Sequence, residues 1–179
     1  MSSGIAPLVL ADADDIAVLQ NRLWRVTYAG LLPEEVLAAR DDEANRRVWR
    51  ERAAVHERQG RSLEGARTWV AHDEVGRPIG WSSAGPPRDE DPPTEVELWS
   101  LYLDVEHQGS GVAGDLVDAA VGAGPAHLWV LDGNDRAIAF YRKVGFEWDG
   151  TVKHDVRLAA DEVRMVRRRV AHPPSSGWG

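Results

Sequence analysis

Apolar residues near the start of the chain recur at intervals of three and four positions. Ile16, Leu19 and Leu23 therefore share one helical face. Asp12 precedes them as a favourable N-cap, because its side chain can accept hydrogen bonds from the free N–H groups of a first helical turn. The pattern predicts an amphipathic helix from Asp12 to about Tyr28.

The remaining first half of the chain predicts one short strand and two further helices. Val9 and Leu10 are expected to form a first strand. Pro33, followed by two acidic residues, suits the first turn of a helix. A polar helix is expected over residues 42–58 and should stop near Gly60.

From Thr68 onward the pattern changes to short apolar runs typical of strands. Residues 68–71 and 79–82 are two such runs, and the polar segment 73–77 between them predicts a hairpin. Residues 85–94 contain four prolines, which remove hydrogen-bond donors and restrict the backbone. We expect this proline-rich loop (residues 85–94) to be an irregular and mobile surface segment.

The second half alternates strands with helices. The expected elements are a long strand 95–104, a glycine-rich turn, a helix to about residue 121, a strand 127–131, a helix 134–144, and strands 148–152 and 163–170. This order predicts an α/β (α+β) fold in which helices cover both faces of a mixed sheet. We expect one domain over residues 1–171 and a disordered tail at residues 172–179.

The composition narrows the possible functions. A chain of 179 residues that is 43% hydrophobic and 28% charged fits one globular domain with a sizeable core. It has no cysteine, which excludes disulfides, thiolate metal sites and a cysteine nucleophile. The six histidines lack metal-ligand spacing, so no metal is predicted.

The charge balance and the sequence of the N-terminus bear on partners and compartment. The 21 basic and 29 acidic residues give a net charge of −8, which argues against nonspecific binding of nucleic acid or an anionic membrane. The first residues lack the basic and apolar segments of a secretory signal, and no apolar run is long enough to cross a bilayer. The expected compartment is the cytoplasm, and the expected assembly is a monomer or homodimer.

A glycine-rich turn between the long strand and the next helix carries the first candidate chemistry. The turn spans residues 108–114 and includes Gly109, Gly111 and Gly114. Glycines let a ligand approach the backbone, and the free N–H groups of a helix start attract anions. A phosphate-bearing ligand is therefore expected. A nucleotide-triphosphatase loop is excluded, because Asp115 stands where that loop needs lysine.

The same glycines also fit a dinucleotide-binding loop. Gly109, Gly111 and Gly114 have G-x-G-x-x-G spacing, and Asp132 follows the next strand where a ribose-binding acid can lie. This interpretation makes the protein an NAD(P)-dependent oxidoreductase. The motif comes late in the chain, however, and too little sequence follows to complete a doubly wound sheet.

A second motif favours a different family. In residues 134–146, Asn134, Ala137 and Tyr141 lie on one helical face, and a Gly-Phe pair ends the segment. Together with Gln108, Gly111 and Ala113, this pattern resembles the GNAT superfamily of acetyl-CoA-dependent N-acetyltransferases. The resemblance covers most of residues 9–170 and is weakest at residues 34–67 and in the proline-rich loop. It implies a mostly antiparallel central sheet flanked by helices.

The resemblance also implies a set of residues that bind acetyl-CoA. The turn is expected to hold the pyrophosphate, and the long strand is expected to pair with the pantetheine amides. The later helix is expected to contact the arm, and its lysine offers a cation near the phosphates. The expected cofactor-binding residues are Leu101, Leu103, Gln108, Gly109, Ser110, Gly111, Val112, Ala113, Gly114, Asn134, Ala137, Phe140 and Lys143.

Two residues are expected to move protons. Tyr141 is the candidate general acid, because the family places a tyrosine near the thioester sulfur and a phenol can protonate a leaving thiolate. Strict alternation along the long strand puts Glu97 on one face with Trp99, Leu101 and Leu103. Partial burial among apolar neighbours suits a base, so Glu97 is the candidate base, acting through water.

The acceptor is expected to be a primary amine on a small molecule or peptide. Trp24 and Tyr28 are four residues apart on the first helix and are expected to line its site. Because the chain has no cysteine, direct attack in a ternary complex is favoured over an acetyl-cysteine intermediate. A family member that senses acetyl-CoA without turnover is the other alternative.

Overall fold

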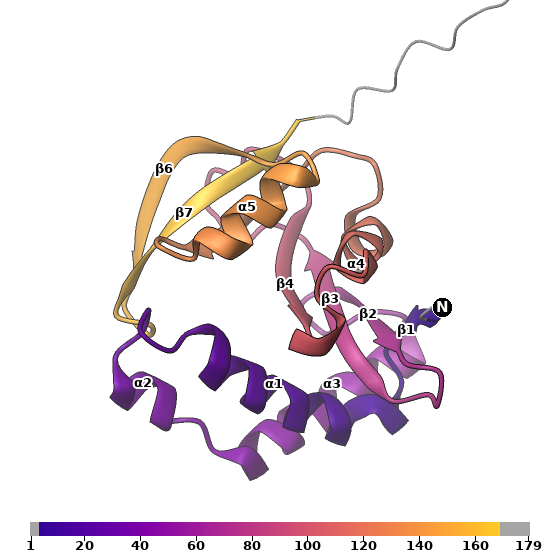
Figure 1. Cartoon of the computed structure of the whole chain (residues 1–179). Coiled ribbons are helices and arrows are strands. Elements are labelled where there is room, and N and C mark those ends of the chain that lie inside the picture. Colours follow the sequence, from indigo (N-terminus) through magenta and orange to yellow (C-terminus); the bar gives the residue numbers. More distant parts are fainter. Residues whose placement is uncertain (1–3, 169–179) are drawn as a thin grey trace, which may run out of the picture.

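The computed structural model describes residues 4–168, which form one seven-stranded sheet in the order β1-β2-β3-β4-β5-β7-β6 (Figure 1). The strands are β1 (Gly4–Pro7), β2 (Arg67–His72), β3 (Pro78–Gly85), β4 (Glu97–Leu103), β5 (Ala126–Leu131), β6 (Glu147–Asp155) and β7 (Ala160–Arg167). The helices are α1 (Ala13–Thr27), α2 (Glu34–Ala38), α3 (Asp42–Gln59), α4 (Val112–Val121) and α5 (Asp135–Lys143), with 3₁₀ turns η1 (Leu10–Asp12) and η2 (Val105–His107). The tail expected at residues 172–179 lies outside the described residues.

The sheet is mixed and mostly antiparallel, as expected. Strands β1 to β4 pair antiparallel in sequence order, and β5, β7 and β6 form a second antiparallel group. The one parallel contact in the described sheet joins β4 to β5. This topology removes the doubly wound parallel sheet on which the dinucleotide interpretation depends.

Helices cover both faces of the sheet (Figure 1). On one face, α1 and α3 bury apolar side chains against Val70 of β2 and Trp81 of β3, and Tyr102 of β4 packs at the edge of this cluster. On the other face, α4 places Leu116 in a cluster with Leu103. The amphipathic pattern of α1 is thus confirmed, since burial of its apolar stripe supplies most of its stability.

The first strand lies earlier than predicted. Val9 and Leu10 lead into η1, whereas β1 is formed by Gly4–Pro7 at the edge of the sheet. An edge strand tolerates Pro7, because the missing N–H group would face solvent rather than a partner strand. A four-residue strand with one β-branched residue gives a weak sequence signal. Among residues 4–168, no helix combines the length and apolar character needed to span a membrane.

The regular alternation predicted for the long strand is wrong because β4 contains a bulge. In the pairing with β3, Ser83 lies opposite Ser100 and Ala84 lies opposite Leu98. Trp99 is therefore an extra residue in β4 without a partner of its own. A residue inserted in this way shifts the following side chains to the opposite face.

The bulge decides which side chains of β4 meet which helices. Leu98, Leu101 and Leu103 belong to clusters that include α4 residues. Tyr102 packs instead with the α1 and α3 cluster. Glu97 precedes the bulge and points away from the face of Leu98. It therefore does not share a face with Leu101 and Leu103, contrary to the expectation from the sequence.

Candidate functional site

The central feature of the site is a fork between β4 and β5. The two strands pair only at Glu97 with His127 and at Leu98 with Leu128. Beyond these pairs, β4 stays bonded to β3 as far as Leu103, while β5 stays bonded to β7. The facing edges of β4 and β5 therefore carry main-chain groups that no strand satisfies. An extended ligand with amide groups can pair with such an edge as a further strand would.

The glycine-rich turn lies at the open end of this fork, directly before α4. Gly109 and Gly111 have φ angles of +82° and +95°, which favour glycine, and Gly111 caps α4. A Cβ atom built at Gly109, Gly111 or Gly114 would meet no other atom within 4 Å. The glycines are thus required by the backbone conformation and leave open space above the turn.

Main-chain donors of the turn face this open space. Within residues 4–168, the N–H groups of Gly109, Gly111 and Ala113 have no hydrogen-bond partner, whereas Gly114 donates to the carbonyl oxygen of Gly111. Gln108 has a buried side-chain oxygen without a partner. Free N–H groups at the start of a ten-residue helix form an anion site. These residues fit a pyrophosphate group.

Helix α5 and its N-cap carry five of the predicted site residues. Asn134 caps the helix, because its side-chain oxygen accepts a hydrogen bond from the main-chain N–H of Ala137 at 3.2 Å. Ala137, Phe140 and Tyr141 are half-buried and pack together on a core cluster. Lys143 is exposed at the end of α5. The capping role of Asn134 uses its oxygen and leaves its amide NH₂ group for a ligand.

All three tyrosines of the chain gather near the fork. The hydroxyl oxygens of Tyr28 and Tyr102 lie 3.4 Å apart. Burial raises the pKa of the Tyr141 phenol well above its usual value, and the neighbouring Tyr102 raises it further. Burial also raises the pKa of Tyr28 and of Tyr102. Tyr141 is therefore protonated at neutral pH, as a proton donor must be.

Glu97 lies at the closed end of the fork in an ion pair. Its carboxylate is fully buried and accepts hydrogen bonds from Arg88, from the main-chain N–H at 2.7 Å, from Nε at 3.0 Å and from Nη2. The Arg88 guanidinium also lies over the ring of Trp99. Both oxygens of the Glu97 carboxylate are thus engaged by Arg88, which leaves little of this buried group open to a water molecule.

The proline-rich loop is irregular, as expected, but polar side chains attach it to the sheet. Besides the Arg88 contacts, Asp89 accepts a hydrogen bond from the indole N–H of Trp129 at 3.0 Å. Asp89 also lies 3.4 Å from His127 and 3.7 Å from Arg164. The loop therefore covers the closed end of the fork as an ordered segment.

The predicted acceptor residues meet as expected from their spacing on α1. The rings of Trp24 and Tyr28 are in edge-to-face contact, with centroids 4.7 Å apart. Both belong to a cluster with Leu32, with Leu131 at the end of β5 and with residues of the β6–β7 turn. The start of α2 and the end of the sheet that contains Leu131 thus enclose one side of the fork.

Sequence reasoning missed three polar residues around this enclosure. Tyr102 faces it because of the bulge. Arg40 comes from the segment between α2 and α3, and its guanidinium lies 3.9 Å from the ring centroid of Trp24. Glu162 of β7 is half-buried, and burial raises its pKa while the Lys153 ammonium lowers it. No motif marks Arg40 or Glu162, since each reaches the site only through tertiary packing.

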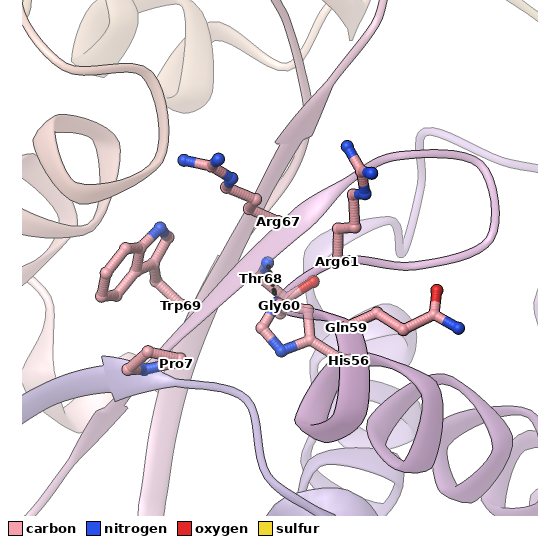
Figure 2. A pocket seen from close by; sticks show the side chains of 8 residues that line it. All are labelled: Pro7, His56, Gln59, Gly60, Arg61, Arg67, Thr68 and Trp69. Atoms are coloured by element: carbon pink, nitrogen blue, oxygen red, sulfur yellow. Dashed lines mark hydrogen bonds between the residues drawn. The ribbon is translucent and has the colours of Figure 1, made fainter.

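A cavity of about 290 Å³ lies elsewhere, where β1 and β2 meet the end of α3 (Figure 2). Arg61, Arg67 and Trp69 line it together with His56. His56 is already satisfied, because its Nδ1 bonds the carbonyl oxygen of Leu8 and its Nε2 accepts the N–H of Thr68. None of the predicted site residues lines this cavity, so the candidate active site is the fork.

The fork, the turn and the protonated phenol together define a class of protein. The split parallel pair offers a free edge to an extended ligand, the turn offers free N–H groups to an anion, and the buried Tyr141 phenol carries a proton. These are the features of an acyltransferase that uses a nucleotide-linked thioester.

Comparisons with known proteins identify the family. A model described as the acetyltransferase (GNAT) family matches residues 28–146. The probable N-acetyltransferase Rv2775 of Mycobacterium tuberculosis is 29% identical over 144 residues, covering 78% of this chain and 76% of that protein. The uncharacterized N-acetyltransferase YuaI of Bacillus subtilis is 30% identical over 139 residues, covering 74% and 73%.

A solved structure shows the same fold. The PaiA N-acetyltransferase from Thermoplasma acidophilum, in complex with coenzyme A, has a TM-score of 0.70 at 21% identity, covering 95% of this chain and 100% of that chain. The chain belongs to the acetyltransferase (GNAT) family, as its two motifs predicted.

Proposed function

We propose that the protein transfers the acetyl group of acetyl-CoA to a primary amine by direct attack in a ternary complex. The observation that supports this most is the fork between β4 and β5, with the glycine-rich turn at its open end. In this proposal the turn binds the pyrophosphate through its free N–H groups. The edge of β4 near Leu101 and Leu103 pairs with the pantetheine amides.

Tyr141 is the proposed general acid. As the amine nitrogen forms a bond to the acetyl carbon, the carbon–sulfur bond breaks and the Tyr141 hydroxyl gives its proton to the leaving thiolate. Its raised pKa keeps that proton available at neutral pH. With no cysteine in the chain, an acetyl-cysteine intermediate is excluded, which supports direct attack.

Glu97 is the proposed base and acts through water on the amine proton. Both oxygens of its carboxylate already accept hydrogen bonds from Arg88, and the group is fully buried, so little of it is open to a water molecule. We therefore assign Glu97 a small share of the rate enhancement and give Tyr141 and the positioning of the amine the larger share.

Two measurements test the proposed function. A ligand that binds only the folded state raises the apparent melting temperature, so we expect acetyl-CoA, and not NAD(H), to stabilise the protein. A panel of amines should then release free coenzyme A thiol and yield acetylated products detectable by mass spectrometry. Stabilisation by NAD(H) alone contradicts the proposal. Stabilisation by acetyl-CoA without acetylation of any amine indicates a sensor rather than an enzyme.

A further inference from the structure

Arg40 carries a positive charge at the acceptor side of the fork without a carboxylate partner. Within residues 4–168 it forms no ion pair, and its one hydrogen bond is a long one of 3.5 Å to the side-chain oxygen of Asn21. The guanidinium is half-buried against the ring of Trp24. Burial lowers the pKa of Arg40, and the nearby hydroxyls of Tyr102 and Tyr28 oppose this shift. The guanidinium charge of Arg40 is therefore available to pair with an anionic group of a ligand.

The indole N–H of Trp24 is a second unused donor at the same place. Trp24 is 8% exposed, and its Nε1 atom is buried with no hydrogen-bond partner among residues 4–168. Two other indoles do have acceptors: the buried Trp49 donates to Gln20 at 2.9 Å, and the half-buried Trp129 donates to Asp89. A buried donor without an acceptor is costly, so an orphan of this kind points to an acceptor group that is supplied by a ligand.

The other charges around this enclosure are balanced. Glu162 lies 3.5 Å from the ammonium of Lys153. Arg25, the other arginine near Arg40, lies 3.3 Å from Asp42. The buried carboxylate at the closed end of the fork is paired with its own arginine, as described above. Arg40 is therefore a cation of this enclosure that no carboxylate within residues 4–168 pairs with.

We propose that the acceptor carries a carboxylate beside its amine, and that Arg40 and the indole N–H of Trp24 bind this carboxylate. The Tyr28–Tyr102 hydroxyl pair then lies between the bound anion and Tyr141, so that the amine end points to the reaction centre. The substrate class is free amino acids, as opposed to polyamines or lysine side chains. This inference rests on the proposed acetyltransferase function.

Matched acceptors test the inference. The full-length enzyme is assayed by thiol release with the twenty amino acids, their carboxamides and the corresponding decarboxylated amines, which differ only at the group that Arg40 would bind. We expect kcat/KM to favour the carboxylate form by about 10- to 100-fold, the usual worth of a hydrogen bond to a charged group. Arg40→Met should abolish this preference, and Arg40→Lys should restore part of it.

A matched control variant separates recognition from folding. Arg25→Gln removes a neighbouring arginine that is exposed and already paired, so we expect the preference to stay unchanged. The inference is overturned if carboxamides or decarboxylated amines react as well as the amino acids, if no amino acid reacts, or if Arg40→Met slows all acceptors equally. Failure of the proposed function looks different, because acetyl-CoA then neither stabilises the protein nor loses its acetyl group to any amine.

Discussion

Glu97→Gln tests whether the carboxylate at the closed end of the fork acts mainly in structure or in chemistry. The substitution keeps the shape of the side chain and removes its charge. In the native protein both carboxylate oxygens accept hydrogen bonds from Arg88. The amide of the substituted side chain has one oxygen that can accept hydrogen bonds. Its NH₂ group would face the N–H donors of Arg88, which need an acceptor.

The magnitude follows from the burial of each partner. Glu97 is buried, whereas the Arg88 side chain is 53% exposed, so water replaces much of what the guanidinium loses. Water does not replace the contacts that the main-chain N–H of Arg88 loses, nor those that the buried amide of the substituted side chain lacks. A charge-assisted hydrogen bond is worth about 1.5–3 kcal/mol, which gives an expected loss of about 2–3 kcal/mol in the free energy of unfolding. For a chain of this size, the melting temperature should fall by roughly 4–12 °C.

Urea denaturation followed by tryptophan fluorescence measures this loss. Arg88→Met and the double variant complete a double-mutant cycle, in which we expect a coupling of about 1–2 kcal/mol between the two side chains. The kcat/KM of Glu97→Gln should fall by less than about tenfold, below the range typical of a strong general base. A fall of more than about 100-fold with unchanged stability would refute the argument that Glu97 acts mainly in structure.

Three further outcomes are expected. Tyr141→Phe should lower kcat by about 100-fold or more while acetyl-CoA affinity changes little, and unchanged kcat in single-turnover assays would remove Tyr141 as the acid. Gly111→Ala forces a side chain into φ +95° and should cost about 1 kcal/mol and weaken acetyl-CoA binding, whereas Gly114→Ala, which has ordinary φ and open space, should not destabilise the fold. Burial lowers the pKa of His56, so stability should be complete above the unfolded value near pH 6.5 and fall below it by up to about 1.4 kcal/mol per pH unit; His56→Gln should reduce this slope in urea titrations.

The elements that the sequence predicts well are those in which local pattern and tertiary burial agree. The apolar stripe of α1 and the stop signal of α3 lie within single segments, and Gly60 does end α3. The bulge in β4 is different, because nothing in residues 97–103 marks Trp99 as the inserted residue. Its position follows from how β4 meets β3, with Ser83 and Ala84 on the other side. Strict alternation therefore fails where a neighbouring strand sets the register.

The same distinction holds within the site. The glycine-rich turn before α4 could be predicted, because its free N–H donors are main-chain groups of one short segment. The pairing of Glu97 with Arg88 could not be predicted from the sequence, because no pattern in the proline-rich loop indicates that it folds back over β4. The role of Arg40 in the site could not be predicted for the same reason, since its contact with Trp24 depends on how α2 and α3 pack after α1.

The fork is held from both ends, and this arrangement limits what it can bind. At the closed end, β4 and β5 diverge directly after Leu98, one residue before the bulge, and the network around Glu97 and His127 joins the strands there. At the open end, the glycine-rich turn is fixed by the start of α4. Between them, residues 99–103 offer about 16 Å of strand edge at roughly 3.3 Å per residue. Only an extended ligand with hydrogen-bonding groups along its length satisfies this edge while its anionic end reaches the turn. In the proposed function, the two fixed ends set the position of the donor's reactive group, which leaves acceptor choice to the helical side of the fork, where Arg40 lies.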